Sequence, residues 1–170
     1  SKLMRSVVAC PKPVIAAVHG PAAGIGASMA LACNLIVASE TAYLLMAFKN
    51  VGIPPDGGAI YFLTQHLGIA RAKEIVYSAR KLPAAEARDM GIISRVVPDG
   101  QLEAETMTLA RDIAGVVSAD LVGTGLFREI TPSAFVNPNL PFGVAPTYTD
   151  WTAINAEALI TAAVAVQGDQ

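Results

Sequence analysis

Cysteine is scarce in this sequence and histidine is equally rare. The 170 residues contain two cysteines, Cys10 and Cys33, which stand apart with no Cys-x-x-Cys pair and no nearby histidine partner. Structural zinc and redox sites are recognised by closely spaced cysteines and histidines. We therefore interpret both cysteines as reduced, buried thiols and expect no metal site.

Long apolar runs, aromatic residues and an excess of positive charge are also missing. No apolar run approaches the roughly 18 residues that a membrane-spanning helix needs. Aromatic residues make up 6% of the chain, and 12 Lys and Arg stand against 14 Asp and Glu without a basic cluster along the sequence. Nucleic-acid binding normally needs a basic surface and often aromatic stacking platforms. We therefore expect neither a nucleic-acid partner nor a membrane span.

Small and aliphatic residues are abundant instead. Hydrophobic residues make up 53% of the chain, and at this length one sizeable core is expected rather than two full domains. Because the apolar residues recur at helix and strand spacing, we assign them to a core and to a buried subunit face.

Short apolar runs alternate with helical patterns along the first two thirds of the chain. This alternation is typical of an α/β fold rather than a helix bundle or a β-sandwich. Strands are expected at residues 14–18, 35–38, 42–46 and 94–97. Helices are expected at residues 1–10, 25–33, 57–67, 70–77, from 82 onward, and at 101–114, with Gly68 as the cap between the third and fourth.

A glycine-rich turn joins the first predicted strand to a helix of small residues. Residues 19–28 read His-Gly-Pro-Ala-Ala-Gly-Ile-Gly-Ala-Ser. The start of a helix leaves several backbone N–H groups without intrahelical partners and carries partial positive charge. Such a turn is suited to holding negative charge.

A second tight turn carries a carboxylate. Residues 54–58 read Pro-Pro-Asp-Gly-Gly and precede another predicted helix. An aspartate here can simply form the turn or cap the helix. Together with the anion-holding turn, however, Asp56 is also a candidate acid–base group, and the two turns indicate an oxyanion holder paired with an acid–base group.

Four segments in this order and spacing resemble the crotonase (enoyl-CoA hydratase/isomerase) superfamily. They read Lys-Pro-Val-Ile-Ala-Ala-Val-His-Gly at 12–20, Ala-Ser-Glu-Thr-Ala at 38–42, Gly-Ile-Pro-Pro-Asp-Gly-Gly at 52–58, and Ala-Ala-Glu-Ala-Arg-Asp-Met-Gly-Ile-Ile at 84–93. The resemblance implies an α/β fold, a crotonase-type spiral of ββα turns with a helical C-terminal region. It also implies assembly as a homotrimer or homohexamer.

The resemblance further implies an acyl-CoA thioester substrate, whose coenzyme A is part of the substrate, and no separate cofactor. In the family, two backbone N–H groups hold the thioester oxygen; one matches the N–H of Ile25, and the other comes from a loop that would precede Ser1. We predict substrate contacts at a set of neighbouring residues, which comprises Ala22, Gly24, Gly26, Ser28 and Phe48.

Family hydratases use two glutamates, and the matching positions here hold Ser28 and Phe48, neither of which is acidic. The stretch from 44 to 58 most resembles the ring-epoxide isomerase branch, the 1,2-epoxyphenylacetyl-CoA isomerases, in which the Asp of this turn is the acid–base residue. A single carboxylate is enough to move a proton between two carbons. We therefore predict an enoyl-CoA isomerase with Asp56 and Ile25 as the catalytic residues.

Several alternatives stay open. A hydratase of fatty-acid or aromatic-acid degradation would use Asp56 with a water near Ser28, a dehalogenase-like enzyme would use Asp56 as a nucleophile, and a scaffold subunit would use neither. A dinucleotide site at Gly24 is disfavoured because Met29 replaces the third glycine. A serine peptidase at Ser28 would need a histidine base, and we interpret His19 and His66 as structural. The four basic residues between 71 and 81 are interpreted as a solvated face.

The predicted organisation is a spiral core at residues 1–114, lacking its N-terminal part, and a region at 115–170 with an irregular segment and a final helix. We expect that second region to serve oligomerisation. The first ten residues resemble a helix end rather than a signal peptide, so the chain is interpreted as a fragment of a longer protein. Its expected place is a bacterial cytoplasm, with an organelle matrix as the alternative.

Overall fold

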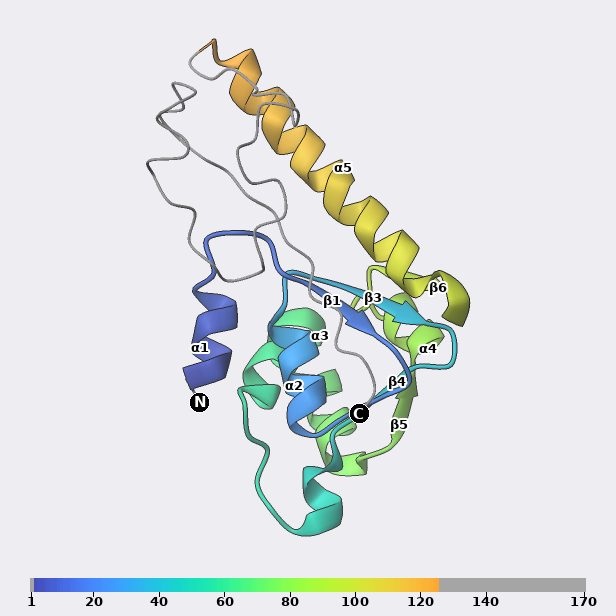
Figure 1. Ribbon diagram of the computed structural model, residues 1–170. Helices are drawn as coiled ribbons and strands as arrows, with labels where there is room; N and C mark the ends of the chain where they lie inside the picture. Colours follow the sequence, from blue (N-terminus) through green and yellow to red (C-terminus); the bar gives the residue numbers. More distant parts are fainter. Residues whose placement is uncertain (1, 126–170) are drawn as a thin grey trace. The chain divides into compact units, whose positions relative to one another are not determined.

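The computed structural model describes residues 2–125 of the chain. It contains five α-helices, six short strands and two 3₁₀ helices within those residues (Figure 1). In chain order they are α1 (Lys2–Val8), β1 (Ile15–Val18), β2 (Pro21–Ala23), α2 (Ile25–Ala32), β3 (Leu35–Ser39), β4 (Tyr43–Leu45), η1 (Ala47–Val51), α3 (Ala59–Ser78), β5 (Lys81–Pro83), α4 (Ala84–Asp89), β6 (Arg95–Val97), η2 (Asp99–Gln101) and α5 (Leu102–Gly123).

The strands form two small sheets. One has the order β1-β3-β6 with all neighbours parallel, and the other has the order β2-β4-β5, in which β4 is parallel to β2 and antiparallel to β5. Both sheets begin in the strand–turn–strand segment from Ile15 to Ala23. Parallel partners need a crossover connection. Helix α2 lies in the connection from β1 to β3 and in that from β2 to β4, whereas the connection from β3 to β6 includes α3 and α4.

The core lies between these sheets and the helices α2, α3 and α4. Alanines on α2 and α4 let the backbones approach closely, and larger side chains fill the space between them. The fully buried large side chains of this core are Leu31, Ile36, Leu44, Met46, Leu63, Ile75 and Leu82. This packing fixes α2 against α3, the two helices whose first residues border the glycine-rich turn and the Asp56 turn.

Most predicted elements are present at their predicted places, and four short ones were not predicted: β2, η1, β5 and η2. Strands β2 and β5 span three residues each and include a proline, which argues against a strand, and the two 3₁₀ helices are too short for a recognisable hydrophobic period. The last predicted helix also runs longer than expected, because α5 continues through Gly115 to Gly123.

Helix α3 contains the break that the sequence predicts at Gly68. Its backbone there has φ 75° and ψ 164°, so two helical stretches meet at a kink. This combination of angles is accessible to glycine and is strongly unfavourable for any residue with a Cβ atom.

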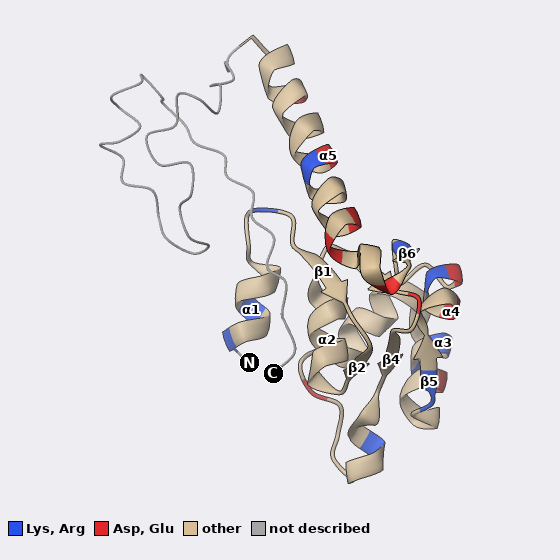
Figure 2. Cartoon of the chain, turned by 45° about the vertical axis from the view of Figure 1, so that its right-hand side comes forward, with Lys and Arg blue, Asp and Glu red and all other residues tan. Residues whose placement is uncertain are grey.

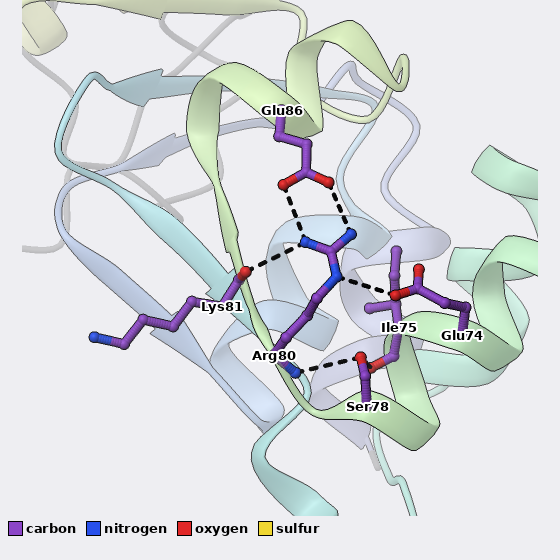
Figure 3. A network of polar contacts seen from close by, with 6 residues as sticks. All are labelled: Glu74, Ile75, Ser78, Arg80, Lys81 and Glu86. Atoms are coloured by element: carbon purple, nitrogen blue, oxygen red, sulfur yellow. Dashed lines mark hydrogen bonds and ion pairs between the residues drawn. The ribbon is translucent and has the colours of Figure 1, made fainter.

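An arginine joins the end of α3 to α4 (Figure 3). Arg80 makes two hydrogen bonds to the Glu86 carboxylate, of 3.0 and 2.7 Å, and one of 3.0 Å from its Nε to Glu74. It follows Ala79, the C-cap of α3, which has a left-handed backbone with φ 48°. The basic residues predicted as a solvated face thus include one whose charge is used in ion pairs.

The chain divides into two compact units, residues 1–107 and residues 108–170. All sheets and the core described above belong to the first unit. In the second unit the described residues, 108–125, continue α5 and its end. The predicted irregular segment and final helix lie outside the described residues, and the proposed boundary at residue 114 stays a prediction.

Candidate active site

The glycine-rich turn leads directly into α2, as the sequence predicts. Gly24 precedes the helix with φ 53°, and its N–H donates to the carbonyl of Leu45 on β4 at 2.8 Å. The first bond of the helix runs from the Ser28 N–H to the Gly24 carbonyl at 3.1 Å. The N–H groups of Ile25, Gly26 and Ala27 therefore precede the hydrogen-bonded ladder of the helix.

Asp56 begins a turn that two glycines continue. Gly57 and Gly58 have φ values of 64° and 80°, a region that glycine tolerates best. The Gly57 N–H donates to the Asp56 carboxylate at 2.6 Å, and the Ala59 N–H donates to the Asp56 carbonyl at 3.2 Å. The carboxylate side chain is exposed, so its position is held by its own turn rather than by burial.

The two turns pack against one another. A Cβ atom at Gly57 would lie 2.4 Å from Cδ1 of Ile25 and 3.0 Å from Cβ of Ser28. The Ser28 hydroxyl lies 3.0 Å from the carbonyl oxygen of Asp56. The absence of a side chain at Gly57 therefore lets the carboxylate turn sit directly on the first turn of α2.

An open hollow of about 480 Å³ lies beside the Asp56 turn. One wall is a face of α1, where residues four apart point the same way, and the other is the turn with Phe62 of α3. The lining residues are Met4, Arg5, Val8, Ala9, Asp56, Gly57, Gly58 and Phe62. The sequence interpretation missed the α1 wall, although the spacing of Met4 and Val8 was the signal that could have shown it.

The remaining predicted substrate contacts lie on neighbouring elements. Ala22 is half-buried on β2, opposite Leu44 of β4. Phe48 is buried in η1 and packs in the core, and it is not among the residues that line the hollow. Their role in substrate binding stays a prediction.

The surroundings of the two turns carry little charge (Figure 2). Helix α2 holds no Lys, Arg, Asp or Glu, and the hollow contains one of each sign, Arg5 and Asp56. An apolar wall with few charges is what an acyl group requires. Within residues 2–125, no group of three or more His, Cys, Asp or Glu is arranged to hold a metal ion.

The Ser28 hydroxyl bonds to backbone carbonyls and not to a histidine among the described residues. That hydroxyl contacts the carbonyls of Gly24 and Asp56, at 3.2 and 3.0 Å. The His66 ring lies 3.4 Å from the Leu31 carbonyl. Among the hydrogen bonds of the described residues, none joins Ser28 to a histidine, which disfavours a peptidase.

A second polar cluster lies at the carboxyl ends of β1, β3 and β6. Thr41 donates its hydroxyl to the Asp99 carboxylate, at 2.9 and 2.8 Å from the two oxygens. This bond holds the pKa of Asp99 below its usual value; the Ser39 hydroxyl and the nearby charge of His19 contribute in the same direction. His19 therefore lies near the Asp99 carboxylate, and its structural role stays a prediction.

Comparison with known proteins places most of the described residues in the family of one matching model. Residues 1–123 match the family model described as Enoyl-CoA hydratase/isomerase. A probable enoyl-CoA hydratase of Rhodobacter capsulatus is 39% identical over 117 residues, covering 69% of this chain and 46% of that protein. The 1,2-epoxyphenylacetyl-CoA isomerase of Escherichia coli is 37% identical over 135 residues, covering 79% of this chain and 50% of that protein.

A solved structure supports the fold. The crystal structure of an enoyl-CoA hydratase from Mycobacterium avium subsp. paratuberculosis matches with a TM-score of 0.63 at 42% identity, covering 69% of this chain and 46% of that one. The α/β fold predicted from the motifs is thereby confirmed. The chain spans about half the length of the curated relatives it matches.

The C-terminal part of the chain matches a second family. Residues 88–170 match the TolB amino-terminal domain. The Tol-Pal system protein TolB of Roseobacter denitrificans is 54% identical over 67 residues, which cover 39% of this chain and 15% of that protein. The match to the first family ends at residue 123, and the match to the second begins at residue 88. The irregular segment that the sequence predicts after Gly115 therefore begins within the overlap of the two matches.

Proposed function

The chain belongs to the enoyl-CoA hydratase/isomerase family, and on this premise we propose that it is part of an acyl-CoA enzyme acting as an enoyl-CoA isomerase. The observation that carries the proposal is the contact between the Asp56 turn and the first turn of α2. This contact puts the turn that bears the Asp56 carboxylate against the start of α2, and the turn also borders a mostly apolar hollow.

In the proposed reaction the Ile25 N–H donates to the thioester oxygen of the substrate. Asp56 removes a proton from the carbon next to the thioester, and the electron pair left behind forms an enolate whose negative charge rests on that oxygen. The protonated Asp56 then returns the proton to a carbon two positions along the chain, and the double bond moves. One N–H donor to such an oxyanion contributes about 3–4 kcal/mol, or 10²–10³ in rate.

The positions that match the family's two glutamates hold Ser28 and Phe48, neither of which is acidic. Asp56 is therefore the acidic residue of this site that can transfer a proton. Isomerisation needs one group that both accepts and donates a proton. Hydration would need a second polar group to deliver water. The proposal therefore favours isomerisation over hydration.

The test is a turnover assay of the full-length protein and its Asp56→Asn variant with trans-2- and cis-3-enoyl-CoA thioesters, read by chromatography and mass. We expect a product of unchanged mass that the variant fails to form. A product heavier by one water would assign the protein as a hydratase instead. No turnover of any thioester by a folded protein would favour a non-catalytic subunit.

A further inference from the structure

Ser28 is fully buried on α2, yet its hydroxyl reaches outside its own helix. The oxygen lies 3.0 Å from the carbonyl of Asp56 and 3.2 Å from the carbonyl of Gly24. A hydroxyl carries one proton and donates it to one acceptor at a time. Each carbonyl also accepts a backbone N–H, Gly24 from Ser28 and Asp56 from Ala59. The contact to Asp56 is the shorter of the two and is the one that links α2 to another segment.

This connection spans the two parts of the proposed site. Ser28 lies one turn after Ile25 on the same helix, and its hydroxyl binds the backbone of the residue whose side chain is the proposed acid–base group. Within the turn, the N–H groups of Gly57 and Ala59 bond to Asp56 itself, and Gly57 packs against α2. The Ser28 hydroxyl adds a hydrogen bond from α2 to this turn.

We propose that Ser28 is a positioning residue: its hydroxyl clamps the Asp56 turn onto the first turn of α2 and so fixes the carboxylate relative to the Ile25 N–H. The proposal rests on the proposed function. A buried hydroxyl with two carbonyl acceptors is poorly placed to hold a reacting water, so Ser28 acts through Asp56 and does not contact the substrate. A displacement of a reacting group by about 1 Å costs about 10²-fold in rate.

The experiment compares Ser28→Ala with Thr106→Val in the full chain. Thr106 is also fully buried, and its hydroxyl donates to the Leu102 carbonyl one turn earlier at 2.7 Å. The control thus removes a buried helical hydroxyl without touching the Asp56 turn. Two quantities are measured: kcat and KM with a CoA thioester, and hydrogen exchange at the amides of Gly57 and Ala59, which bond to Asp56.

We expect Ser28→Ala to lower kcat by about 10- to 100-fold with little change in KM. We also expect the two amides to exchange at least tenfold faster, while Thr106→Val leaves both quantities unchanged. Faster exchange with an unchanged kcat would overturn the positioning role and leave Ser28 structural. Unchanged exchange would overturn the clamp itself.

Two further outcomes keep the inference separate from the proposed function. If the wild-type protein turns over no thioester, the proposed function fails, but the exchange rates still decide whether Ser28 holds the turn. If Ser28→Ala does not fold, Ser28→Cys replaces it, because a thiol fills the same space and donates a weaker hydrogen bond. For Ser28→Cys, amide exchange that is faster than in the wild type, together with a partly lowered kcat, would support the clamp. Exchange rates and a kcat equal to those of the wild type would overturn it.

Discussion

Gly57 is the residue on which the geometry of the candidate site depends most directly. It combines a left-handed backbone with a close approach to α2, where a Cβ atom would meet Ile25 and Ser28. Gly52 has nearly the same φ, 68° against 64°, but open space around the position of its missing Cβ. Alanine substitutions at these two glycines can therefore separate the cost of backbone strain from the cost of overpacking.

We predict that Gly52→Ala costs about 1 kcal/mol, the strain of a left-handed alanine. Gly57→Ala should cost more, by about 1–3 kcal/mol, because the added methyl group also overpacks the contact with α2. Urea unfolding of both variants measures the difference. Equal costs for the two variants would show that the Asp56 turn does not press against α2.

Asp99 gives a prediction for the pH dependence of stability. The Thr41 hydroxyl bond is the largest cause that holds the pKa of Asp99 below its ordinary value of 3.8 in the folded protein. A carboxylate with a lowered folded-state pKa stabilises the fold above its unfolded-state pKa, and that contribution is lost as the pH falls through the folded-state value.

Thr41→Val should therefore destabilise the protein at neutral pH and converge with the wild type in strong acid. Thermal melts of both proteins between neutral pH and pH values below the ordinary pKa of Asp99 check this. A destabilisation that is the same at every pH would indicate that the lost threonine packing, rather than the bond to Asp99, is responsible.

The residues of the site could be named from the sequence, but their surroundings could not. The glycine-rich turn and the Pro-Pro-Asp-Gly-Gly turn carry their own signals, because glycine and proline restrict or permit particular backbone angles. The Ser28 bond to Asp56 joins residues 28 positions apart. No local pattern encodes such a contact, so Ser28 was interpreted from its position alone.

At the scale of helices and strands, Arg80 makes the clearest prediction. Its guanidinium binds Glu86 through two bonds and Glu74 through one, and so joins α3, β5 and α4 (Figure 3). The bond from Arg80 is the largest cause that lowers the pKa of Glu86, and the same bond raises the pKa of Arg80. All three side chains remain partly exposed, so the effect on stability is modest.

Arg80→Gln should lower the melting temperature at neutral pH by a few degrees. The difference from the wild type should shrink as the pH falls below the ordinary pKa of Glu86, 4.5, because protonation removes the bonded carboxylate. Arg88→Gln is the matched control, since Arg88 pairs with its exposed neighbour Asp89 and joins no two elements. Equal effects of the two substitutions would contradict a linking role for Arg80.

The helices and strands that could be predicted have either a hydrophobic pattern over several residues or a residue that clearly marks where they begin or end. Helix α2 follows a glycine turn, and Gly68 marks the kink of α3. Strands β2 and β5 were not predicted because each has three residues, one of them a proline. Each strand depends on pairing with β4, a partner far along the chain. Their presence is fixed by tertiary contacts rather than by local preference.

At the scale of the whole molecule, many large apolar side chains remain exposed in the described residues. On and around α3 they include Ile53, Ile60, Tyr61, Ile69 and Tyr77, each about half exposed or more. Exposed apolar surface of this kind is typical of protein–protein contacts. In addition, residues 2–125 contain no helix that is long and apolar enough to cross a membrane.

We predict that the protein self-associates as a trimer or a pair of trimers. Light scattering coupled to size-exclusion chromatography should give three or six times the chain mass of 17.6 kDa. A monomer at micromolar concentration would contradict the prediction and leave the exposed apolar residues of α3 to another partner.

The measurement that tests the central claim most directly is the exchange of substrate protons with solvent. The full-length protein and its Asp56→Asn variant are incubated in D₂O with a 3-enoyl-CoA thioester, and deuterium at the carbon next to the thioester is followed by mass and NMR. If Asp56 removes a proton while the Ile25 N–H holds the enolate oxygen, the exposed Asp56 carboxyl group exchanges that proton for deuterium from the solvent before it protonates the enolate again. The wild type then incorporates deuterium and the variant does not. Equal incorporation by both proteins would contradict the assignment of Asp56 as the acid–base group.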